Sequence, residues 1–415
     1  MESRGTIFST DPAWIAKLLA WADCHFPYVA NFSHQDICYP YGGFDQVFYA
    51  GHQSCTLEEL EKQPLYMDRV GILSYELKNR FERLQSTNEA IIDCPHSVFF
   101  LPTLKMLHSD KNVQIFHEQP ERIFAEIDAF KVPFLTTKID SIRPLTSRNE
   151  YLKNVEKIKE HIIDGDIYEM NYCLAFEVGL KTFNPVHTYL SLMKQSPMPF
   201  SVFFKAGNQY VVSASPERFL KKSGSRIIAQ PIKGTIRRGD SAQEDEVLRQ
   251  QLQHSEKERA ENLMIVDLMR NDLARIATTG SVKVEELFGV YPFKRVSQMI
   301  STVSASLRPK LNFKDIVANT FPMGSMTGAP KIRCMELIDQ YENFRRGWFS
   351  GSIGYISANG DFDFNVVIRS IIVDVSANKL FFAVGSAITY DADPAQEYEE
   401  CLLKAMPIFD VLTAK

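Results

Sequence analysis

A lysine beside a glycine is the residue of this chain with the clearest chemical potential. Lys233 lies in the segment Gln230-Pro231-Ile232-Lys233-Gly234-Thr235. Proline interrupts strand pairing and glycine permits a tight turn, so the segment predicts a flexible loop that presents an amine to a ligand. A lysine in such a setting is more often a solvated loop residue, and the segment alone therefore assigns no function.

Four glutamates form two pairs with three-residue spacing in segments of helical pattern: Glu258 with Glu261, and Glu397 with Glu400. Residues three apart share one face of a helix. Two such faces meeting across a cavity would make an oxygen-rich site suited to Mg²⁺, which takes few protein carboxylates and keeps positions for water and an anionic ligand. The alternative is two solvated helix faces neutralised by Lys257, Arg259 or Lys404.

Two glycine-bearing segments could bind anions. The first, Gly324-Ser325-Met326-Thr327-Gly328-Ala329-Pro330-Lys331, runs into a predicted helix. Free backbone N–H groups and the positive helix end favour carboxylate or phosphate there, although the spacing is not that of a Walker A loop and a structural junction would look the same. The second, Ala383-Val384-Gly385-Ser386-Ala387-Ile388, precedes the last glutamate pair, and its alternative is a strand-end turn.

The overall composition restricts the class of protein. The 415 residues are 45% hydrophobic and 23% charged, with a formal net charge of −5 and no long uncharged apolar run, so a membrane span and a nucleic-acid surface are not expected. The N-terminus does not have the form of a secretory signal. Seven scattered cysteines without Cys-x-x-Cys spacing predict reduced thiols in a cytoplasmic protein, and a small-molecule partner is the better expectation.

Strand-like runs recur along the chain in hairpin-like groups rather than in strict alternation with helices. This pattern predicts an α+β fold with large antiparallel sheets covered by helices. Periodicity is lost around residues 133–148, and Ser147 then caps an amphipathic helix. We therefore divide the chain into a strand-rich subdomain, residues 1–140, and a catalytic domain, residues 141–415. Longer helices are expected at about 255–275 and after Pro394.

Eight segments in order resemble the chorismate-utilising enzymes, the family that contains anthranilate synthase component I, aminodeoxychorismate synthase component I and the isochorismate and salicylate synthases. The resemblance covers about residues 145–410, and the first 140 residues match loosely. It implies a sandwich of two mostly antiparallel sheets, with residues 1–140 packed into it. The motifs are Gly165-Asp166-Ile167-Tyr168, Ser215-Pro216-Glu217-Arg218-Phe219, Pro231-Ile232-Lys233-Gly234-Thr235, Lys257-Glu258-Arg259-Ala260-Glu261-Asn262 with Asp267-Leu268-Met269-Arg270-Asn271-Asp272, the Gly324 segment, Gly351-Ser352-Ile353-Gly354-Tyr355, Ile368-Arg369-Ser370, and Glu397-Tyr398-Glu399-Glu400 to Lys404.

Lys233 discriminates within that family. Aminodeoxychorismate synthases commonly carry lysine in this motif, whereas anthranilate synthases generally carry alanine, and Asn171 also resembles the former group. The water-activating lysine expected of isochorismate-type members is absent from the strand after Asp166. The resemblance thus implies amination of chorismate at C4 to 4-amino-4-deoxychorismate, for p-aminobenzoate and folate. The alternatives are anthranilate synthase component I and a catalytically silent chorismate-binding subunit.

The resemblance also implies residue roles. Lys233 would attack C2 while Glu217 protonates the C4 hydroxyl as it leaves, and Mg²⁺ would be bound by the four glutamates, Glu258, Glu261, Glu397 and Glu400. The substrate carboxylates would be contacted by Thr327, Gly328, Tyr355, Arg369, Gly385 and Lys404. The roles require the pKa of Lys233 to be lowered, by burial or by a cation such as Arg237, and that of Glu217 to be raised. Ammonia is expected from a separate glutaminase subunit, with free ammonia as a substitute.

Two positions depart from the family pattern. Gln298 stands where many relatives have a histidine, whose loss should matter less in an enzyme that stops at the aminated ring than in one that eliminates pyruvate. Ala387 replaces a frequent glycine. The Leu-Leu-Glu-Ser effector segment of anthranilate synthases is absent, so no tryptophan feedback is expected.

Overall fold

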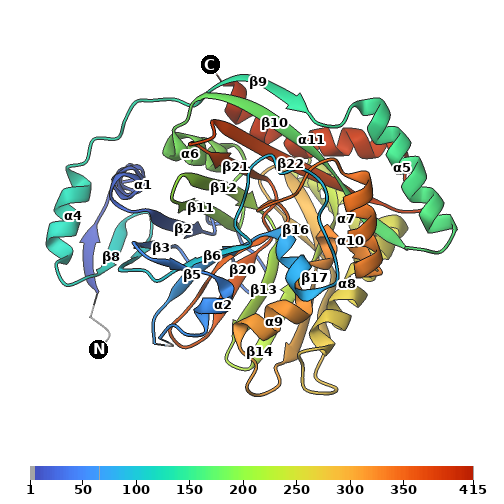
Figure 1. The fold of residues 1–415 in the computed structure, drawn as a ribbon, viewed down its shortest axis with the longest axis horizontal. Coiled ribbons are helices and arrows are strands. Elements are labelled where there is room, and N and C mark those ends of the chain that lie inside the picture. The colour runs from blue at the N-terminus through green and yellow to red at the C-terminus, as the bar shows by residue number, and fades with distance from the viewer. Residues whose placement is uncertain (1–4, 65, 415) are drawn as a thin grey trace.

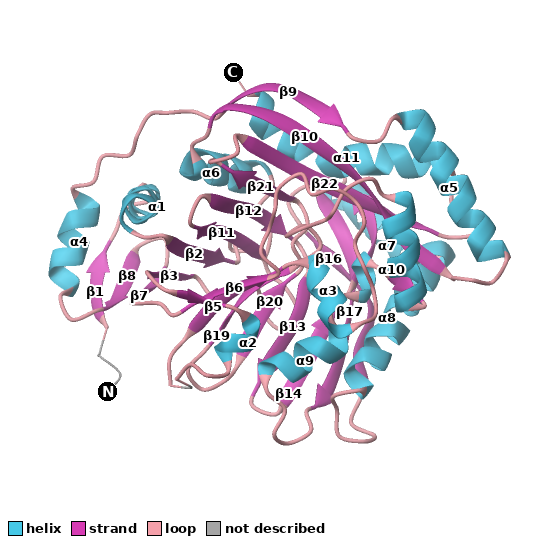
Figure 2. Ribbon diagram, viewed as in Figure 1, coloured by secondary structure: helices cyan, strands magenta, loops and turns pink. Residues whose placement is uncertain are grey.

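Two β-sheets packed face to face form the body of the molecule, and helices lie around their outer faces (Figures 1 and 2). The structure, a computed structural model, describes residues 5–64 and 66–414. Neighbouring strands pair antiparallel in both sheets. The predicted α+β fold with two large, mostly antiparallel sheets covered by helices is confirmed.

The larger sheet has twelve strands. Its order is β1 (Thr6–Ser9), β8 (Asn112–Phe116), β7 (Leu104–His108), β3 (Val47–Gly51), β2 (Tyr28–Ser33), β11 (Phe200–Ala206), β12 (Gln209–Ser215), β21 (Ser370–Asp374), β22 (Lys379–Ile388), β10 (Glu169–Thr182) and β18 (Gly328–Ala329), with β9 (Lys138–Pro144) also paired to β10.

The smaller sheet has ten strands. Its order is β15 (Ile232–Arg237), β17 (Val296–Ser306), β14 (Arg226–Gln230), β13 (Arg218–Ser223), β20 (Phe362–Asn365), β19 (Ser352–Ile356), β5 (Arg69–Leu73), β6 (Ser97–Phe100) and β4 (Ser54–Cys55), with β16 (Lys283–Pro292) also paired to β17.

The helices of the described residues differ widely in length. They are α1 (Trp14–His25), α2 (Leu57–Leu60), α3 (Lys78–Phe81), α4 (Pro120–Asp128), α5 (Arg148–Ile163), α6 (Pro185–Gln195), α7 (Ala242–His254), α8 (Glu256–Ala274), α9 (Phe313–Thr320), α10 (Lys331–Tyr341) and α11 (Pro394–Thr413), with single 3₁₀ turns η1 (Tyr75–Leu77) and η2 (Gly324–Met326). None of them is long and apolar enough to cross a bilayer.

Local chemistry explains where the site-bearing helices begin. The Ser255 hydroxyl accepts a hydrogen bond from the Glu258 N–H at the start of α8, and the Asp393 side chain accepts one from the Gln396 N–H at the start of α11. Such caps satisfy N–H groups that have no partner within the helix. Helix α8 packs on β15 and β17, and α11 packs on β22, so the two glutamate-bearing helices are fixed to different sheets.

Strands from residues 1–140 are hydrogen-bonded into both sheets. In the larger sheet β2 pairs with β11, and in the smaller sheet β5 pairs with β19. Aromatic side chains join the sheets, since the ring of Phe32 lies 5.1 Å, centroid to centroid, from that of Tyr355. Burial of such rings contributes about 25 cal/mol per Å² of apolar area.

The structure corrects two expectations about local structure. The Lys233 segment is strand β15 rather than a flexible loop, with its register against β17 shifted between Ile232 and Thr235. The helices α6, α7 and α9 were not predicted from the sequence, although each has a side-chain N-cap: Asn184, Ser241 and Asn312.

Candidate active site

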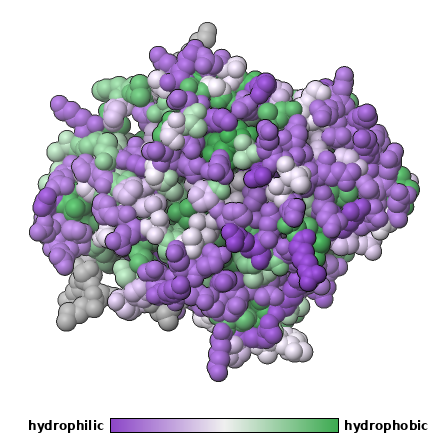
Figure 3. Space-filling view, in the orientation of Figure 1, coloured by the Kyte–Doolittle hydropathy of each residue, from purple (hydrophilic) through white to green (hydrophobic). Residues whose placement is uncertain are grey.

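A cavity of about 400 Å³ lies where α8, α11, β15 and β22 converge. This volume falls within the usual range for sites that bind small molecules. The cavity brings together nine of the twelve predicted site residues: Glu217, Lys233, Glu258, Glu261, Arg369, Gly385, Glu397, Glu400 and Lys404. Asn171, Gln298, Ser325, Ser386 and Ala387 also line it. The face of the molecule drawn in Figure 3 is mostly hydrophilic, with apolar side chains in small groups.

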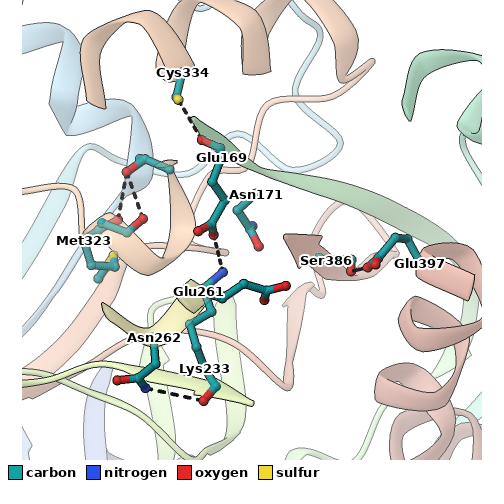
Figure 4. Close-up of polar contacts among 12 residues, drawn as sticks. Glu169, Asn171, Lys233, Glu261, Asn262, Met323, Cys334, Ser386 and Glu397 are labelled. Carbon is teal, nitrogen blue, oxygen red and sulfur yellow. Dashed lines mark hydrogen bonds and ion pairs between the residues drawn. The ribbon is translucent and has the colours of Figure 1, made fainter. Parts of the chain in front are cut away.

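Lys233 points from β15 toward a buried carboxylate on β10 (Figure 4). The shifted register places Gly234 at a φ of +91°, and a side chain there would approach within 3.0 Å of the Glu258 carboxylate. Glycine is therefore required beside the lysine. The Lys233 Nζ donates to Glu169 Oε1 at 2.5 Å, and its side chain is only 10% exposed.

The expectation that the pKa of Lys233 is lowered is wrong. Burial lowers the pKa of the Lys233 amine, but the carboxylates of Glu169 and Glu261 outweigh burial, so the pKa is raised. Arg237, proposed as the cation that lowers this pKa, instead forms an exposed ion pair with Glu244. The resting amine is therefore a paired ammonium.

Glu169, the partner of Lys233, was not among the residues predicted from the sequence. Its side chain is 1% exposed, and its second oxygen, Oε2, has no hydrogen-bond partner among the described residues. A signal was available, because Glu169 is the single charged residue in the apolar stretch from Ile167 to Phe176. Buried carboxylates need a partner, and the sequence did not show that Lys233 would be that partner.

Glu217 lies between β12 and β13 and is 5% exposed. Burial raises the pKa of its carboxyl to about 7, against the opposing effect of the Lys233 charge. The expectation of a raised pKa is confirmed. At neutral pH Glu217 is thus able to donate a proton, the property required of a general acid.

The two glutamate pairs face each other from α8 and α11 across the cavity. The Lys257 Nζ lies 3.8 Å from Glu261 Oε1 and 3.7 Å from Glu397 Oε1, so this ammonium stands between the helices. Ser386 donates a hydrogen bond to Glu397 (Figure 4). Burial raises the pKa of Glu261 to about 7 and also raises those of Glu258 and Glu397. The carboxylates therefore line a cavity, as a metal site requires, and are also partly neutralised by Lys257, as the alternative interpretation expected.

The donor set fits Mg²⁺ in kind. All four groups are carboxylates, which suit a hard cation, and the raised pKa values of Glu258, Glu261 and Glu397 reflect a cost of burying their charge that a bound cation would offset. Within residues 5–64 and 66–414, no three acidic, histidine or cysteine side chains are already gathered closely enough to hold a metal ion. Lys257 competes for the same carboxylates.

Arg369 is the cavity cation best placed to meet a substrate carboxylate. Among the described residues no carboxylate lies within 4 Å of its guanidinium, and burial lowers the pKa of the group. Lys404 differs, because its Nζ is 2.6 Å from Glu400 Oε1 and donates to the Gly385 carbonyl at 2.8 Å. Gly385 is close to β10, where an added side chain would meet Asn171 at 2.7 Å.

Three predicted substrate-binding residues do not line the cavity. Thr327 is buried and donates its hydroxyl to the carbonyls of Met323 and Gly324. Gly328 packs on β10, where a side chain would approach the Glu169 carbonyl within 2.1 Å. Tyr355 donates its hydroxyl to Asp45 at 2.8 Å on the side of the N-terminal strands. Thr327 and Gly328 directly follow the lining residues Ser325 and Met326, whereas Tyr355 lies outside the cavity.

A fully buried ion pair, which the sequence did not predict, holds together the loop and the strand that form one wall of the cavity. The Arg346 guanidinium lies 2.6 Å from the Glu342 carboxylate, and both side chains are 1% exposed. Arg346 also donates to the backbone carbonyls of Met326 and Asn171. Buried charges persist only when paired and hydrogen-bonded, so this pair fixes β10 against the segment before α10.

Gln298 lines the cavity from β17 and is 3% exposed. Its side-chain oxygen has no hydrogen-bond partner in the described part of the chain. An amide cannot act as a general base near neutral pH, so no base is present at this position.

Comparison with known proteins agrees with the site. A family model for chorismate binding enzymes matches residues 41–410. The chain is 36% identical over 371 residues to aminodeoxychorismate synthase component 1 of Klebsiella aerogenes, covering 87% of this chain and 82% of that protein. It is 44% identical over 269 residues to the chloroplastic aminodeoxychorismate synthase of Arabidopsis thaliana, which is 64% of this chain and only 29% of that longer protein.

A solved structure shows the same arrangement of strands and helices. The crystal structure of anthranilate synthase component I from Streptococcus pneumoniae TIGR4 superposes with a TM-score of 0.74 at 25% identity, covering 98% of this chain and 92% of that one. The match over most of the chain, together with the cavity and its residues, shows that the protein belongs to the family of chorismate binding enzymes.

Proposed function

We propose that this protein aminates chorismate at C4 with ammonia to give 4-amino-4-deoxychorismate. The observation that carries the proposal is that one cavity is lined by both a buried lysine, Lys233, and a glutamic acid, Glu217, whose pKa is about 7. The name of the Klebsiella relative, matched over most of both chains, supports the same reaction. The product would serve p-aminobenzoate and folate synthesis.

Charge balance in the cavity suits a dicarboxylate taken together with a divalent cation. Six lysine or arginine side chains and five glutamates line it, and a dianion with Mg²⁺ leaves that balance unchanged. Glu258, Glu261, Glu397 and Glu400 would hold Mg²⁺, which would supply Lewis-acid stabilisation of a carboxylate. Arg369 would bind a carboxylate through charge-assisted hydrogen bonds.

The covalent chemistry follows from the two central residues. The Lys233 amine attacks C2 while Glu217 gives its proton to the C4 hydroxyl, which leaves as water. Ammonia then adds at C4 and the lysine leaves C2 as the amine. Each displacement avoids a free carbocation, and the covalent step divides one difficult substitution into two easier ones.

Gln298 supports a reaction that stops at the aminated ring. Elimination of pyruvate needs a base to remove a ring proton, and the amide at this position cannot supply one. Anthranilate synthase component I is for this reason, and because of Lys233, the weaker candidate.

Ammonia would come from a separate glutaminase subunit; the name of the Klebsiella relative, component 1, is consistent with a second component. All seven cysteines are unpaired thiols, which supports a cytoplasmic location.

Product analysis tests the proposal. The purified protein is incubated with chorismate, Mg²⁺ and an ammonium salt, and products are separated and identified by mass. We expect 4-amino-4-deoxychorismate without pyruvate release. Anthranilate or isochorismate as the sole product would overturn the proposal, and no turnover with either ammonia or a glutaminase would favour the silent subunit.

A further inference from the structure

We infer that Glu169 is a second acid-base residue of the reaction: it takes the proton of the Lys233 ammonium before the amine attacks and returns it when the lysine leaves. The inference rests on the proposed function, because it concerns how the same lysine becomes a nucleophile. A lysine must be neutral to attack carbon, whereas the resting Lys233 is an ammonium held by carboxylates.

The contact between the two residues is already suited to proton transfer. Lys233 Nζ and Glu169 Oε1 are 2.5 Å apart, with side chains 10% and 1% exposed (Figure 4). A general base must lie within hydrogen-bond reach of the proton that it takes. The second oxygen of Glu169 is buried and has no partner among the described residues, so the carboxylate keeps an unused acceptor position.

The backbone on both sides of the contact is fixed. Glu169 begins β10, where it pairs with Ala329 of β18, and its carbonyl accepts a hydrogen bond from the Cys334 thiol at 3.2 Å. On β15 the carbonyl of Lys233 accepts one from the Asn262 side chain at 3.4 Å. The two groups thus meet from opposite sheets with little freedom to separate.

The other charged groups around Lys233 are less suited to accept this proton. The carboxyls that act on its charge are Glu169, Glu217, Glu258, Glu261 and Glu400. Only Glu169 lies within 4 Å of Nζ in the residues that the structure describes. Glu217 must itself carry a proton to release the hydroxyl, and the proposed function assigns the α8 and α11 glutamates to Mg²⁺. Glu169 does not line the cavity, so the substrate's carboxylates need not approach it.

The proton balance closes over one cycle. Glu169 takes one proton, and the neutral amine forms the bond to C2 as the C4–O bond breaks and Glu217 protonates the departing oxygen. The adduct is a secondary ammonium. When ammonia forms the C4–N bond, the C2–N bond breaks and its electron pair stays on Lys233 as a neutral amine. Glu169 then reprotonates Lys233, and the new C4 ammonium gives one proton to Glu217.

The test uses Glu169→Gln, which keeps the shape of the side chain and removes its charge. Two quantities are measured on the whole protein: kcat with chorismate and ammonia, and the pH at which Lys233 becomes reactive toward trinitrobenzenesulfonate, located by peptide mass. We expect the reactive pH to fall by roughly one to three units, because an opposite charge is lost. We expect kcat to fall by about 10²- to 10⁴-fold, the usual contribution of a general base.

That combination separates proton transfer from simple charge pairing. If Glu169 merely held the ammonium, the variant with a more often neutral lysine would keep or increase its kcat, and this result would overturn the inference. In the background of Lys233→Ala, Glu169→Gln should cause no further loss, because both act in one step. Independent, additive losses would also contradict the inference.

Asp272→Asn provides a matched control. Asp272 and Lys331 form another buried lysine–carboxylate pair at 2.5 Å, with side chains 5% and 14% exposed, and neither lines the cavity. The Asp272→Asn substitution should lower thermal stability, while kcat should stay within about threefold of the wild-type value. If wild-type protein makes no aminodeoxychorismate, the proposed function fails, whereas wild-type product with an undiminished Glu169→Gln overturns the proton-transfer inference alone.

Discussion

Replacing Glu217 with glutamine should make the protein more stable at alkaline pH while it abolishes most activity. The carboxyl is 5% exposed, and its pKa rises on folding from 4.5 to about 7. A carboxyl with a raised pKa in the folded state binds protons more tightly there than in the unfolded chain. It therefore destabilises the folded protein increasingly as pH rises from 4.5 to 7, and fully above that range.

The magnitude follows from the two pKa values. The cost of ionising Glu217 in the folded protein is about 0.8 kcal/mol at pH 5 and about 3.3 kcal/mol at pH 8. Glutamine has no charge to bury, so the stability difference between Glu217→Gln and wild type should grow by about 2.5 kcal/mol over this interval. Urea unfolding at both pH values, followed by fluorescence, measures it.

The same pKa sets the activity. Between pH 6 and pH 8 the protonated fraction of Glu217 falls from about nine-tenths to about one-tenth. With free ammonia held constant, kcat/KM for chorismate should fall about tenfold in wild type. Glu217→Gln should lose about 10²- to 10⁴-fold in rate and lose this pH dependence. A variant no more stabilised at pH 8 than at pH 5, with wild-type activity, would refute the reasoning about a buried general acid.

Other perturbations address the rest of the site. Arg369→Met should raise KM for chorismate about 10- to 100-fold, since a hydrogen bond to a charged group contributes about 1.5–3 kcal/mol; an unchanged KM would exclude a carboxylate contact. Chelation by EDTA should lower activity roughly a hundredfold and Mg²⁺ should restore it, whereas activity indifferent to EDTA would remove Mg²⁺ from the account. Arg346→Met should reduce the free energy of unfolding by about 3–5 kcal/mol, because Glu342 is left as an unpaired buried charge; urea unfolding measures this, and a loss below about 1 kcal/mol would show that Glu342 finds other partners.

The parts of the site that sequence predicted are those carried by local patterns. The three-residue spacing of Glu258 and Glu261 places both on one face of α8, and capping by Ser255 sets where that helix begins. Because such signals lie within one segment, they survive folding unchanged. Lys233 and Glu217 were likewise identified as candidate site residues, each from a single motif.

The parts that sequence did not predict depend on which distant segments meet. Glu169 and Lys233 are 64 residues apart, and only the convergence of β10 and β15 makes them a pair. That pairing reverses the expected pKa shift of the lysine. Thr327 and Gly328 were predicted to bind substrate because a glycine-rich loop before a helix often binds anions, but pairing of β18 with β10 uses this loop as a wall.

The central claim, that Lys233 carries the amination, is tested most directly by comparing wild type with Lys233→Ala for aminodeoxychorismate formation from chorismate, Mg²⁺ and ammonium. Thermal unfolding checks that both proteins are folded. The account predicts 4-amino-4-deoxychorismate from wild type and a loss of at least about 10³-fold in the variant, within the range for loss of a nucleophile or its base. Equal rates in the two proteins would contradict it.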